Sequence, residues 1–163
     1  MPTSKNKIIL GIDPGIAITG YGVVKLKNKE CRMIKCGAIV TGAAEPFGQR
    51  LEKLHLGITK IIKTYKPDEV AVEKLFFAKN TKTALAVGEA RGVINLAIQQ
   101  NNCRLREFTP LQVKQAMTGY GQASKQQIQT MIKEQLKLKE EPRPDDVADA
   151  LAIAVCSAYT KIY

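Results

Sequence analysis

The sequence has few side chains that bind soft or borderline metals. Its only histidine is His55, and its four cysteines (Cys31, Cys36, Cys103 and Cys156) stand singly rather than in CxxC pairs. This pattern indicates neither a disulfide framework nor a zinc site. Any metal that the chain binds must therefore be held by oxygen ligands.

Long apolar runs are also absent. The longest fall far short of the roughly 20 residues that a membrane span needs. Residues 1–5, with the sequence MPTSK, lack the apolar core of a signal peptide. We therefore expect a cytoplasmic protein without a membrane anchor.

Acidic residues are in the minority. The chain has 15 Asp and Glu against 25 Lys and Arg, which gives a formal net charge of +10 at pH 7. Such an excess favours a polyanionic partner, either nucleic acid or an acidic membrane surface.

With 163 residues, 45% of them hydrophobic, the chain can build one sizeable core. We therefore expect residues 1–163 to form a single domain.

Periodicity and turn signals predict an α/β fold with a mixed five-stranded sheet and helices packed on its faces. Apolar runs and alternating segments predict the strands, the first of which should be central, and helical spacing and capping signals predict the helices. The expected strands are 8–13, 19–26, 32–40, 69–73 and 103–108. The expected helices are 46–65 with Pro46 in the first turn, 81–100, a short one after Pro110, one capped by Ser124 and Gln127, and one from near Pro144.

The predicted helix 81–100 carries small residues at a four-residue repeat. These residues are Ala84, Gly88 and Gly92, and small residues at this spacing permit close approach of another helix. This stripe is a candidate contact within the core or between two copies of the chain.

Acidic residues occur where two predicted strands end and on the last helix. Asp13 ends the first strand before Pro14-Gly15, Glu73 ends the strand 69–73, and Asp146 and Asp149 are three residues apart on the helix. Taken singly, these acids could be a turn former, a solvated strand end and a helix-start residue. Together they favour convergence on one site.

Asp145 precedes the helical pair and has a simpler explanation. As an N-cap or first-turn residue it would be stabilised by the helix dipole alone. We therefore leave it out of the candidate site.

A site made of carboxylates alone suits a hard octahedral cation, Mg²⁺ or Mn²⁺. Two such ions, roughly 4 Å apart, can activate water and stabilise the leaving oxygen of a phosphodiester. Basic residues flank the acids in sequence and could attract a polyanion. They are Lys74, Lys79, Lys82, Arg91, Lys114 and Lys125.

Phe76 and Phe77 are adjacent large aromatic residues in a predicted strand-to-helix loop. Two such side chains are hard to bury together, so one of them is a candidate for stacking on an unpaired base, an interaction of roughly 1–3 kcal/mol. A packing role in the core is the alternative for either ring.

These motifs, taken together, resemble one known family. They are Gly11-Ile12-Asp13-Pro14-Gly15, Thr19-Gly20-Tyr21-Gly22, Glu73 with Phe76 and Ala78-Lys79-Asn80, Gly88-Glu89-Ala90-Arg91-Gly92, Val113-Lys114-Gln115, and Asp146-Val147-Ala148-Asp149-Ala150-Leu151-Ala152. In this order and at this spacing, from about Ile8 to Ala158, the sequence resembles the RuvC family of bacterial Holliday junction resolvases.

The resemblance implies a ribonuclease H-like fold and a magnesium-dependent endonuclease. Such an enzyme acts as a homodimer in recombination and repair and makes paired nicks in a four-way DNA junction, so the expected partner is DNA rather than a membrane. It also implies cooperation with the branch-migration proteins RuvA and RuvB.

The resemblance further implies roles for individual residues. The implied metal ligands are Asp13, Glu73, Asp146 and Asp149, Lys125 joins them as a catalytic residue, and Mn²⁺ is expected to replace Mg²⁺. The implied DNA contacts are Phe76, Phe77, Lys79, Asn80, Lys114 and Lys125.

Three other interpretations compete with this one. The first motif, Gly11–Gly15, also occurs in sugar kinases and actin-like ATPases, although those enzymes need two lobes. The basic charge alone would suit a non-catalytic nucleic-acid-binding module, but four clustered acids would repel phosphate unless a metal neutralised them. The third alternative is another ribonuclease H-like nuclease, such as one that processes ribosomal RNA.

Overall fold

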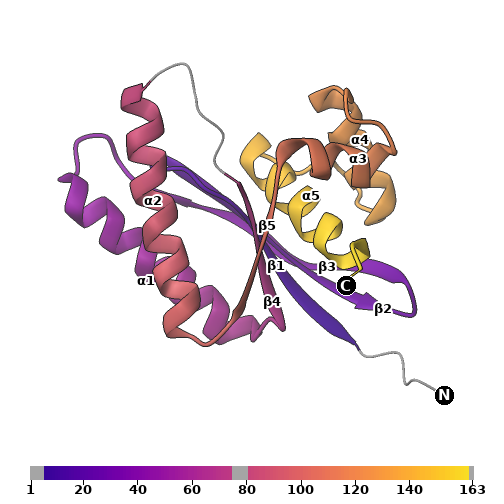
Figure 1. The fold of residues 1–163 in the computed structure, drawn as a ribbon, viewed down its shortest axis with the longest axis horizontal. Coiled ribbons are helices and arrows are strands. Elements are labelled where there is room, and N and C mark those ends of the chain that lie inside the picture. The colour runs from indigo at the N-terminus through magenta and orange to yellow at the C-terminus, as the bar shows by residue number, and fades with distance from the viewer. Residues whose placement is uncertain (1–5, 75–80, 162–163) are drawn as a thin grey trace.

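A five-stranded mixed sheet forms the centre of the computed structural model, which describes residues 6–74 and 81–161 (Figure 1). The strand order is β3-β2-β1-β4-β5, so the first strand is central, as predicted. β1 pairs antiparallel with β2 and parallel with β4. β2 pairs antiparallel with β3, and β4 parallel with β5. The strands are β1 (Lys7–Asp13), β2 (Ile18–Lys27), β3 (Glu30–Val40), β4 (Glu69–Glu73) and β5 (Arg104–Phe108).

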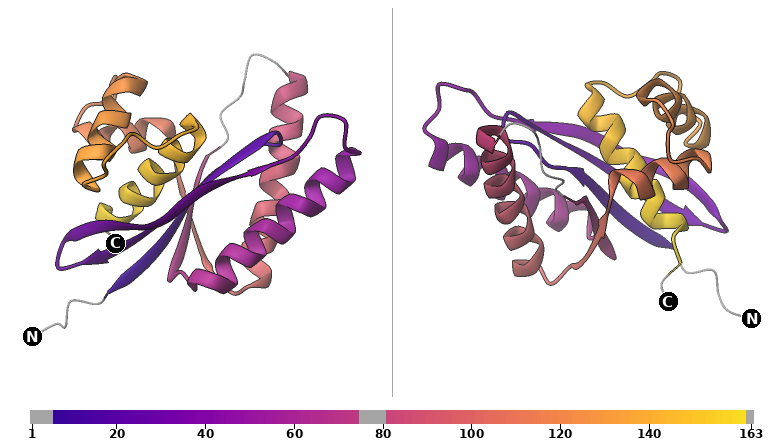
Figure 2. Two further views of the ribbon diagram at one scale, coloured as in Figure 1. Left: turned by 180° about the vertical axis from the view of Figure 1, so that it is seen from behind. Right: turned by 45° about the horizontal axis from the view of Figure 1, so that its top comes forward.

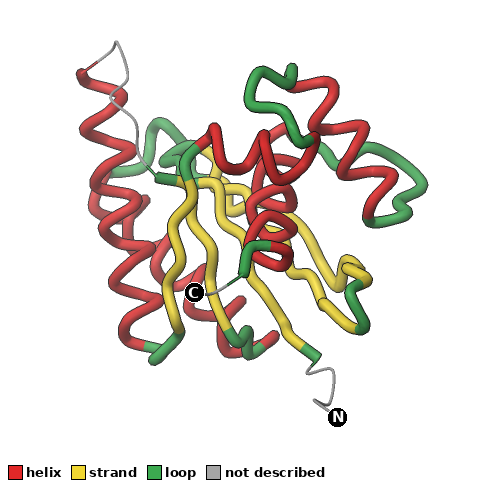
Figure 3. Tube along the Cα trace, turned by 45° about the vertical axis from the view of Figure 1, so that its right-hand side comes forward, coloured by secondary structure: helices red, strands yellow, loops and turns green. Residues whose placement is uncertain are grey.

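The helices cover both faces of the sheet (Figure 2). On one face lie α1 (Phe47–Tyr65) and α2 (Thr81–Gln100), which pack against each other. On the other face lies α5 (Asp145–Tyr159), which crosses β1 and β2 and carries α3 (Pro110–Thr118) and α4 (Lys125–Gln135) on its outer side (Figures 1 and 3). The predicted α/β fold is therefore confirmed.

Side chains of β1 and β4 alternate between two separate cores. Leu10, Ile12, Val70 and Val72 pack with residues of α1 and α2. Ile9 and Ala71 pack with residues of α5. Because side chains of a strand alternate between its faces, the last residues of β1 and β4 belong to the α5 face.

Two glycines allow α5 to lie close to the sheet. A Cβ atom on Gly11 would lie 2.1 Å from the Ala150 carbonyl oxygen, and one on Gly20 would lie 2.0 Å from the Asp146 carbonyl oxygen. Gly20 is also the residue paired with the last residue of β1. The missing side chains therefore bring the first turns of α5 to the end of β1.

A buried ionic network fixes the other end of α5. Glu69 at the start of β4 is 1% exposed. Its carboxylate accepts a hydrogen bond from the Ser157 hydroxyl at 2.5 Å and forms ion pairs with Lys7 at 2.7 Å and Arg106 at 3.3 Å. The network thus joins β1, β4, β5 and α5, and satisfies a charge that would otherwise be costly to bury.

The ends and faces of the helices agree only in part with the predictions. Pro46 lies before α1 as its N-cap, with an extended ψ of 138°, rather than in the first turn. Gly92 of the small-residue stripe is exposed, and a Cβ atom there would meet no atom of the described residues within 4 Å, so this position makes no core contact. The capping box predicted at Ser124 and Gln127 is confirmed at the start of α4.

Within residues 6–74 and 81–161, no helix is both long and apolar enough to cross a membrane.

Candidate active site

The structure brings the four candidate acids together at the carboxyl ends of the strands β1 and β4. Asp13 and Glu73 are the last residues of the neighbouring strands β1 and β4, and Asp146 and Asp149 lie on the first two turns of α5. Burial, followed by the negative charges of the other three acids, raises the pKa of Asp13 from 3.8 to about 8. Carboxylates that influence one another so strongly share one local environment.

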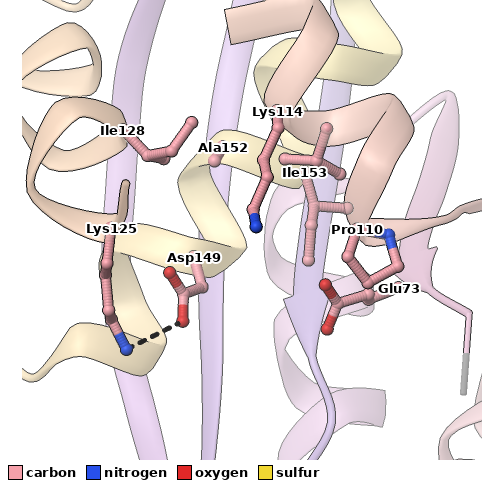
Figure 4. Close-up of a pocket in the computed structure, with 9 residues that line it drawn as sticks. Glu73, Pro110, Lys114, Lys125, Ile128, Asp149, Ala152 and Ile153 are labelled. Atoms are coloured by element: carbon pink, nitrogen blue, oxygen red, sulfur yellow. Dashed lines mark ion pairs between the residues drawn. The ribbon is translucent and has the colours of Figure 1, made fainter. Parts of the chain in front are cut away.

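Glu73 and Asp149 line a pocket of about 260 Å³ between β4, α3, α4 and α5 (Figure 4). Lys114 of α3 and Lys125 of α4 enter the same pocket. Apolar side chains complete the walls, namely Pro110, Val113, Ile128, Ala152 and Ile153. The pocket therefore places two lysine ammonium groups beside two carboxylates in partly apolar surroundings.

The acids in the pocket resist ionisation. Burial and the charge of Asp149 raise the pKa of Glu73, although Arg91 and Lys114 oppose the shift. Burial also raises the pKa of Asp149, against the attraction of Lys125. At each carboxylate, the nearby lysine and arginine side chains do not fully offset the effects of burial and of the neighbouring acids on the pKa.

Lys125 lies between two carboxylates of α5. Its Nζ atom is 3.6 Å from Oδ2 of Asp149, a pair marked in Figure 4, and 3.2 Å from Oδ2 of Asp145. Burial lowers the pKa of the Lys125 ammonium, but these acids outweigh that effect and leave the pKa above its ordinary value. Lys125 therefore remains charged at neutral pH beside the acid cluster.

Arg91 supports Glu73 from the opposite face of the sheet. Its guanidinium, 13% exposed, donates hydrogen bonds to the backbone carbonyl of Glu73 and to the carboxylate of Glu107 on β5. Arg91 is one of the basic residues that flank the acids in sequence, and in the structure its side chain contacts these two partners. It fixes the end of β4 relative to α2 and β5.

The donor set fits a hard divalent cation. All four clustered side chains offer carboxylate oxygens. Burial and then mutual repulsion raise the pKa of Asp13, and a bound cation would offset both effects. Among the residues that the structure describes, no three acidic, histidine or cysteine side chains are arranged as a ready metal-binding group.

Asp145 lies in the first turn of α5, after the N-cap Pro144, so the expected position is confirmed. The helix dipole alone does not explain it, however, because its carboxylate also binds Lys125 and Gln129. Both partners lie on α4, and the sequence contains no local pattern that connects them to α5.

The remaining candidates fall into two groups. Lys114 lies in the pocket with the acids. Phe76, Phe77, Lys79 and Asn80 lie outside the described residues. Sequence reasoning missed Glu107 and Gln129, because each stands beside other charged or polar residues in the chain and carries no local signal.

The sheet order and the acid cluster at the β1–β4 edge define a nuclease of the ribonuclease H-like class. The family model for crossover junction endodeoxyribonuclease RuvC matches residues 9–157. The RuvC proteins of Caldicellulosiruptor saccharolyticus and Clostridioides difficile are 56% and 53% identical to this chain, over 91% and 94% of it and 90% of each relative. The chain belongs to the RuvC family of crossover junction endodeoxyribonucleases.

Solved structures agree with this assignment. Thermus thermophilus RuvC, 36% identical, superposes with a TM-score of 0.87 and covers 93% of this chain and 94% of its own. The same protein in complex with a Holliday junction substrate gives 0.90, with 94% and 93% covered. The family and the ribonuclease H-like fold expected from the motifs are confirmed, and the alternatives of an ATPase, a non-catalytic module and a ribosomal-RNA nuclease are set aside.

Proposed function

We propose that this chain resolves four-way DNA junctions in recombination and repair by hydrolysing phosphodiester bonds in two opposing strands. The observation that carries the proposal is the convergence of Asp13, Glu73, Asp146 and Asp149 at one sheet edge, in a chain of this family. The whole of residues 1–163 would act as one nuclease domain. The net charge of +10 suits a DNA substrate.

Two Mg²⁺ ions are the proposed cofactor, and Mn²⁺ is expected to replace them. Bound there, the ions would activate water and stabilise the leaving oxygen of the phosphodiester. Asp13, Glu73, Asp146 and Asp149 would hold them, since all four offer hard oxygen donors. Asp13 would be the central member of this set, since it ends the central strand β1 and the charges of the other three acids act on it.

Lys114 and Lys125 are the proposed phosphate contacts at the cut strand. Both enter the pocket that Glu73 and Asp149 line. Lys125 would act as a catalytic residue beside the phosphate, where a fixed cation stabilises developing negative charge. By family resemblance, Phe76, Phe77, Lys79 and Asn80 would contact unpaired or neighbouring nucleotides.

Paired cutting requires two active sites, and we propose that the chain forms a homodimer through α2. Leu85 and Leu96 are 67% and 51% exposed on this helix. Gly92 lies between them at helical spacing and leaves open space beside the backbone. An exposed apolar face of this kind suits a second copy of the chain. Leu96→Glu should therefore shift the protein toward monomer in sedimentation velocity, whereas Leu111→Glu, at an exposed position of α3, should not.

RuvA and RuvB are the proposed protein partners, on the strength of family membership alone. Co-purification of the three proteins on a synthetic junction would test this association. A junction-bound enzyme that RuvA and RuvB displace completely would contradict it.

One cleavage experiment tests the central proposal. A synthetic four-way junction, a linear duplex and a structured RNA would each be incubated with the enzyme in Mg²⁺, in Mn²⁺ and in EDTA. We expect paired nicks in the junction only, and only with metal. Asp13→Asn should bind the junction without cutting it, and the matched control Glu52→Gln, an exposed acid on α1, should cut normally. Normal cutting by Asp13→Asn would refute the metal-site assignment.

A further inference from the structure

Asp145 is held in a defined position against α4. Its Oδ1 atom accepts a hydrogen bond from Nε2 of Gln129 at 2.9 Å, and its Oδ2 atom is 3.2 Å from Nζ of Lys125. Gln129 is only 5% exposed, so its amide is itself fixed by packing. Arg143 makes a longer contact of 3.7 Å to the same carboxylate from the exposed loop before α5. Asp145 is thus positioned through one oxygen and binds Lys125 through the other.

The two partners on α4 are four residues apart, one helical turn, so they present their side chains on the same face. Lys125 opens α4 and Gln129 follows on the next turn. The buried amide of Gln129 orients the carboxylate, and the carboxylate in turn limits the rotamers of the long, half-exposed Lys125 side chain.

Lys125 has a second acidic neighbour whose charge is not constant during the proposed reaction. Asp149, 3.6 Å away, is a proposed metal ligand. A divalent cation on Asp149 would neutralise it and weaken its attraction for the ammonium. Asp145 is not one of the proposed ligands, so its pair with Lys125 would persist in the metal-loaded enzyme.

We propose that Asp145 is a positioning residue that keeps Lys125 beside the metal site, so that the ammonium meets the phosphate of the strand to be cut. This inference rests on the proposed function of Lys125. It assigns a role to an acid that is outside the proposed set of metal ligands and DNA contacts, and it extends the active site to a buried glutamine on α4.

A double-mutant cycle tests the proposal. Asp145→Asn retains an oxygen that can accept from Gln129 but loses the charge that attracts Lys125. In single-turnover cutting of a synthetic four-way junction with saturating Mg²⁺, we expect its maximal rate to fall by about tenfold. The enzyme concentration for half-maximal rate should stay unchanged, and Asp145→Glu should recover part of the loss. In a Lys125→Ala background, Asp145→Asn should have no further effect, because the two residues act as one unit.

The control variant is Glu141→Gln. Glu141 precedes α5, accepts a hydrogen bond from Gln126 of α4 at 3.1 Å, and pairs with Arg143 at 3.9 Å rather than with Lys125. The substitution removes the same charge from the same α4–α5 contact region and should cut at the wild-type rate. An equal loss in Glu141→Gln would mean that Asp145 serves only to join the helices and would overturn the proposal.

A measurement without metal or DNA separates this inference from the proposed function. Because Asp149 also attracts Lys125 when no metal is bound, the comparison is made with Asp149 replaced by Asn. The ¹⁵N relaxation of the Lys125 ammonium, assigned by its disappearance in Lys125→Ala, should show an ordered group in Asp149→Asn and a mobile one when Asp145→Asn is added to it. Equal mobility, or an additive rate loss in the cycle, overturns the positioning role. A wild-type enzyme that leaves the junction uncut refutes the proposed function instead, and the relaxation measurement still decides whether Asp145 orders Lys125.

Discussion

Asp13→Asn should stabilise the metal-free protein, and the gain should grow as the pH rises from about 4 to about 8. The reason is electrostatic: burial and the charges of Glu73, Asp149 and Asp146 raise the pKa of Asp13 from 3.8 to about 8. Between these pH values the folded protein holds a proton that the unfolded chain has released. Stability therefore falls as the pH rises through this window, opposite to the behaviour of a salt-bridged carboxylate.

The structure sets an upper limit for the size of this effect. The interval from 3.8 to about 8 is about four pH units, and about 1.4 kcal/mol per unit gives about 6 kcal/mol. Lys125 offsets part of the repulsion, and the neighbouring acids can share the proton among themselves. We therefore expect the stability difference between Asp13→Asn and wild type to increase by about 2–3 kcal/mol across the window.

Urea unfolding in EDTA measures this difference directly at about pH 5 and about pH 8. Glu52→Gln, on the far side of the sheet, is the control and should track the wild type at both values. Excess Mg²⁺ should reduce or reverse the difference, because a cation stabilises the ionised acids of the wild type. A difference that stays constant with pH in EDTA, or an Asn variant that is less stable at pH 8, would refute the reasoning.

Three further outcomes are expected. Arg91→Gln should loosen the end of β4 that carries Glu73. The Mg²⁺ concentration for half-maximal junction cutting should rise by about tenfold, while the maximal rate stays near that of the wild type. An unchanged Mg²⁺ titration would show that Arg91 does not support Glu73. Gly20→Ala should cost at least about 3 kcal/mol of stability or prevent folding, since its Cβ would meet α5. Gly48→Ala, at an exposed position of α1 where a Cβ would meet no described atom within 4 Å, should gain up to about 1 kcal/mol. Thermal unfolding distinguishes the two variants, and equal effects would contradict the helix packing. Phe76→Ala should impair junction cutting more than binding to linear duplex, and equal losses in both assays would favour a packing role.

The strands that carry Asp13 and Glu73 could be predicted because local sequence determines them. A short apolar run stopped by Pro14-Gly15 places Asp13 at a strand end, and the alternation of Val70 and Val72 places Glu73 on the opposite face of its strand. Burial patterns of this kind repeat over a few residues, so the chain itself displays them.

The supports of the site could not be predicted in this way. Arg91 follows Glu73 by 18 residues and reaches it from the other face of the sheet, while its second partner, Glu107, is brought near by the parallel pairing of β4 and β5. From sequence, a lysine or arginine near acidic residues is most simply a solvated cation. Whether such a side chain is exposed or bound to protein groups depends on where its helix packs, and no local periodicity predicts that packing.

The same limitation explains why sequence alone gives no reason to include Asp145 in the site. The helix dipole already explains an acid in the first turn of a helix. The local pattern therefore gives no sign that Asp145 also has side-chain partners. The partners arise because α4 lies across the start of α5, which places Gln129 and Lys125 opposite Asp145.

Helix α2 connects the proposed dimer surface to the proposed metal site. Its outer side presents Leu85 and Leu96, and its inner side carries Arg91, whose guanidinium binds the carbonyl of Glu73. Gly92, adjacent to Arg91 in the chain, lies on the outer side. The Arg91 guanidinium joins α2 directly to the end of β4. Any movement of α2 that accompanies association of two copies would therefore also move the end of β4. The position of Glu73 thus depends on contacts from both faces of the sheet.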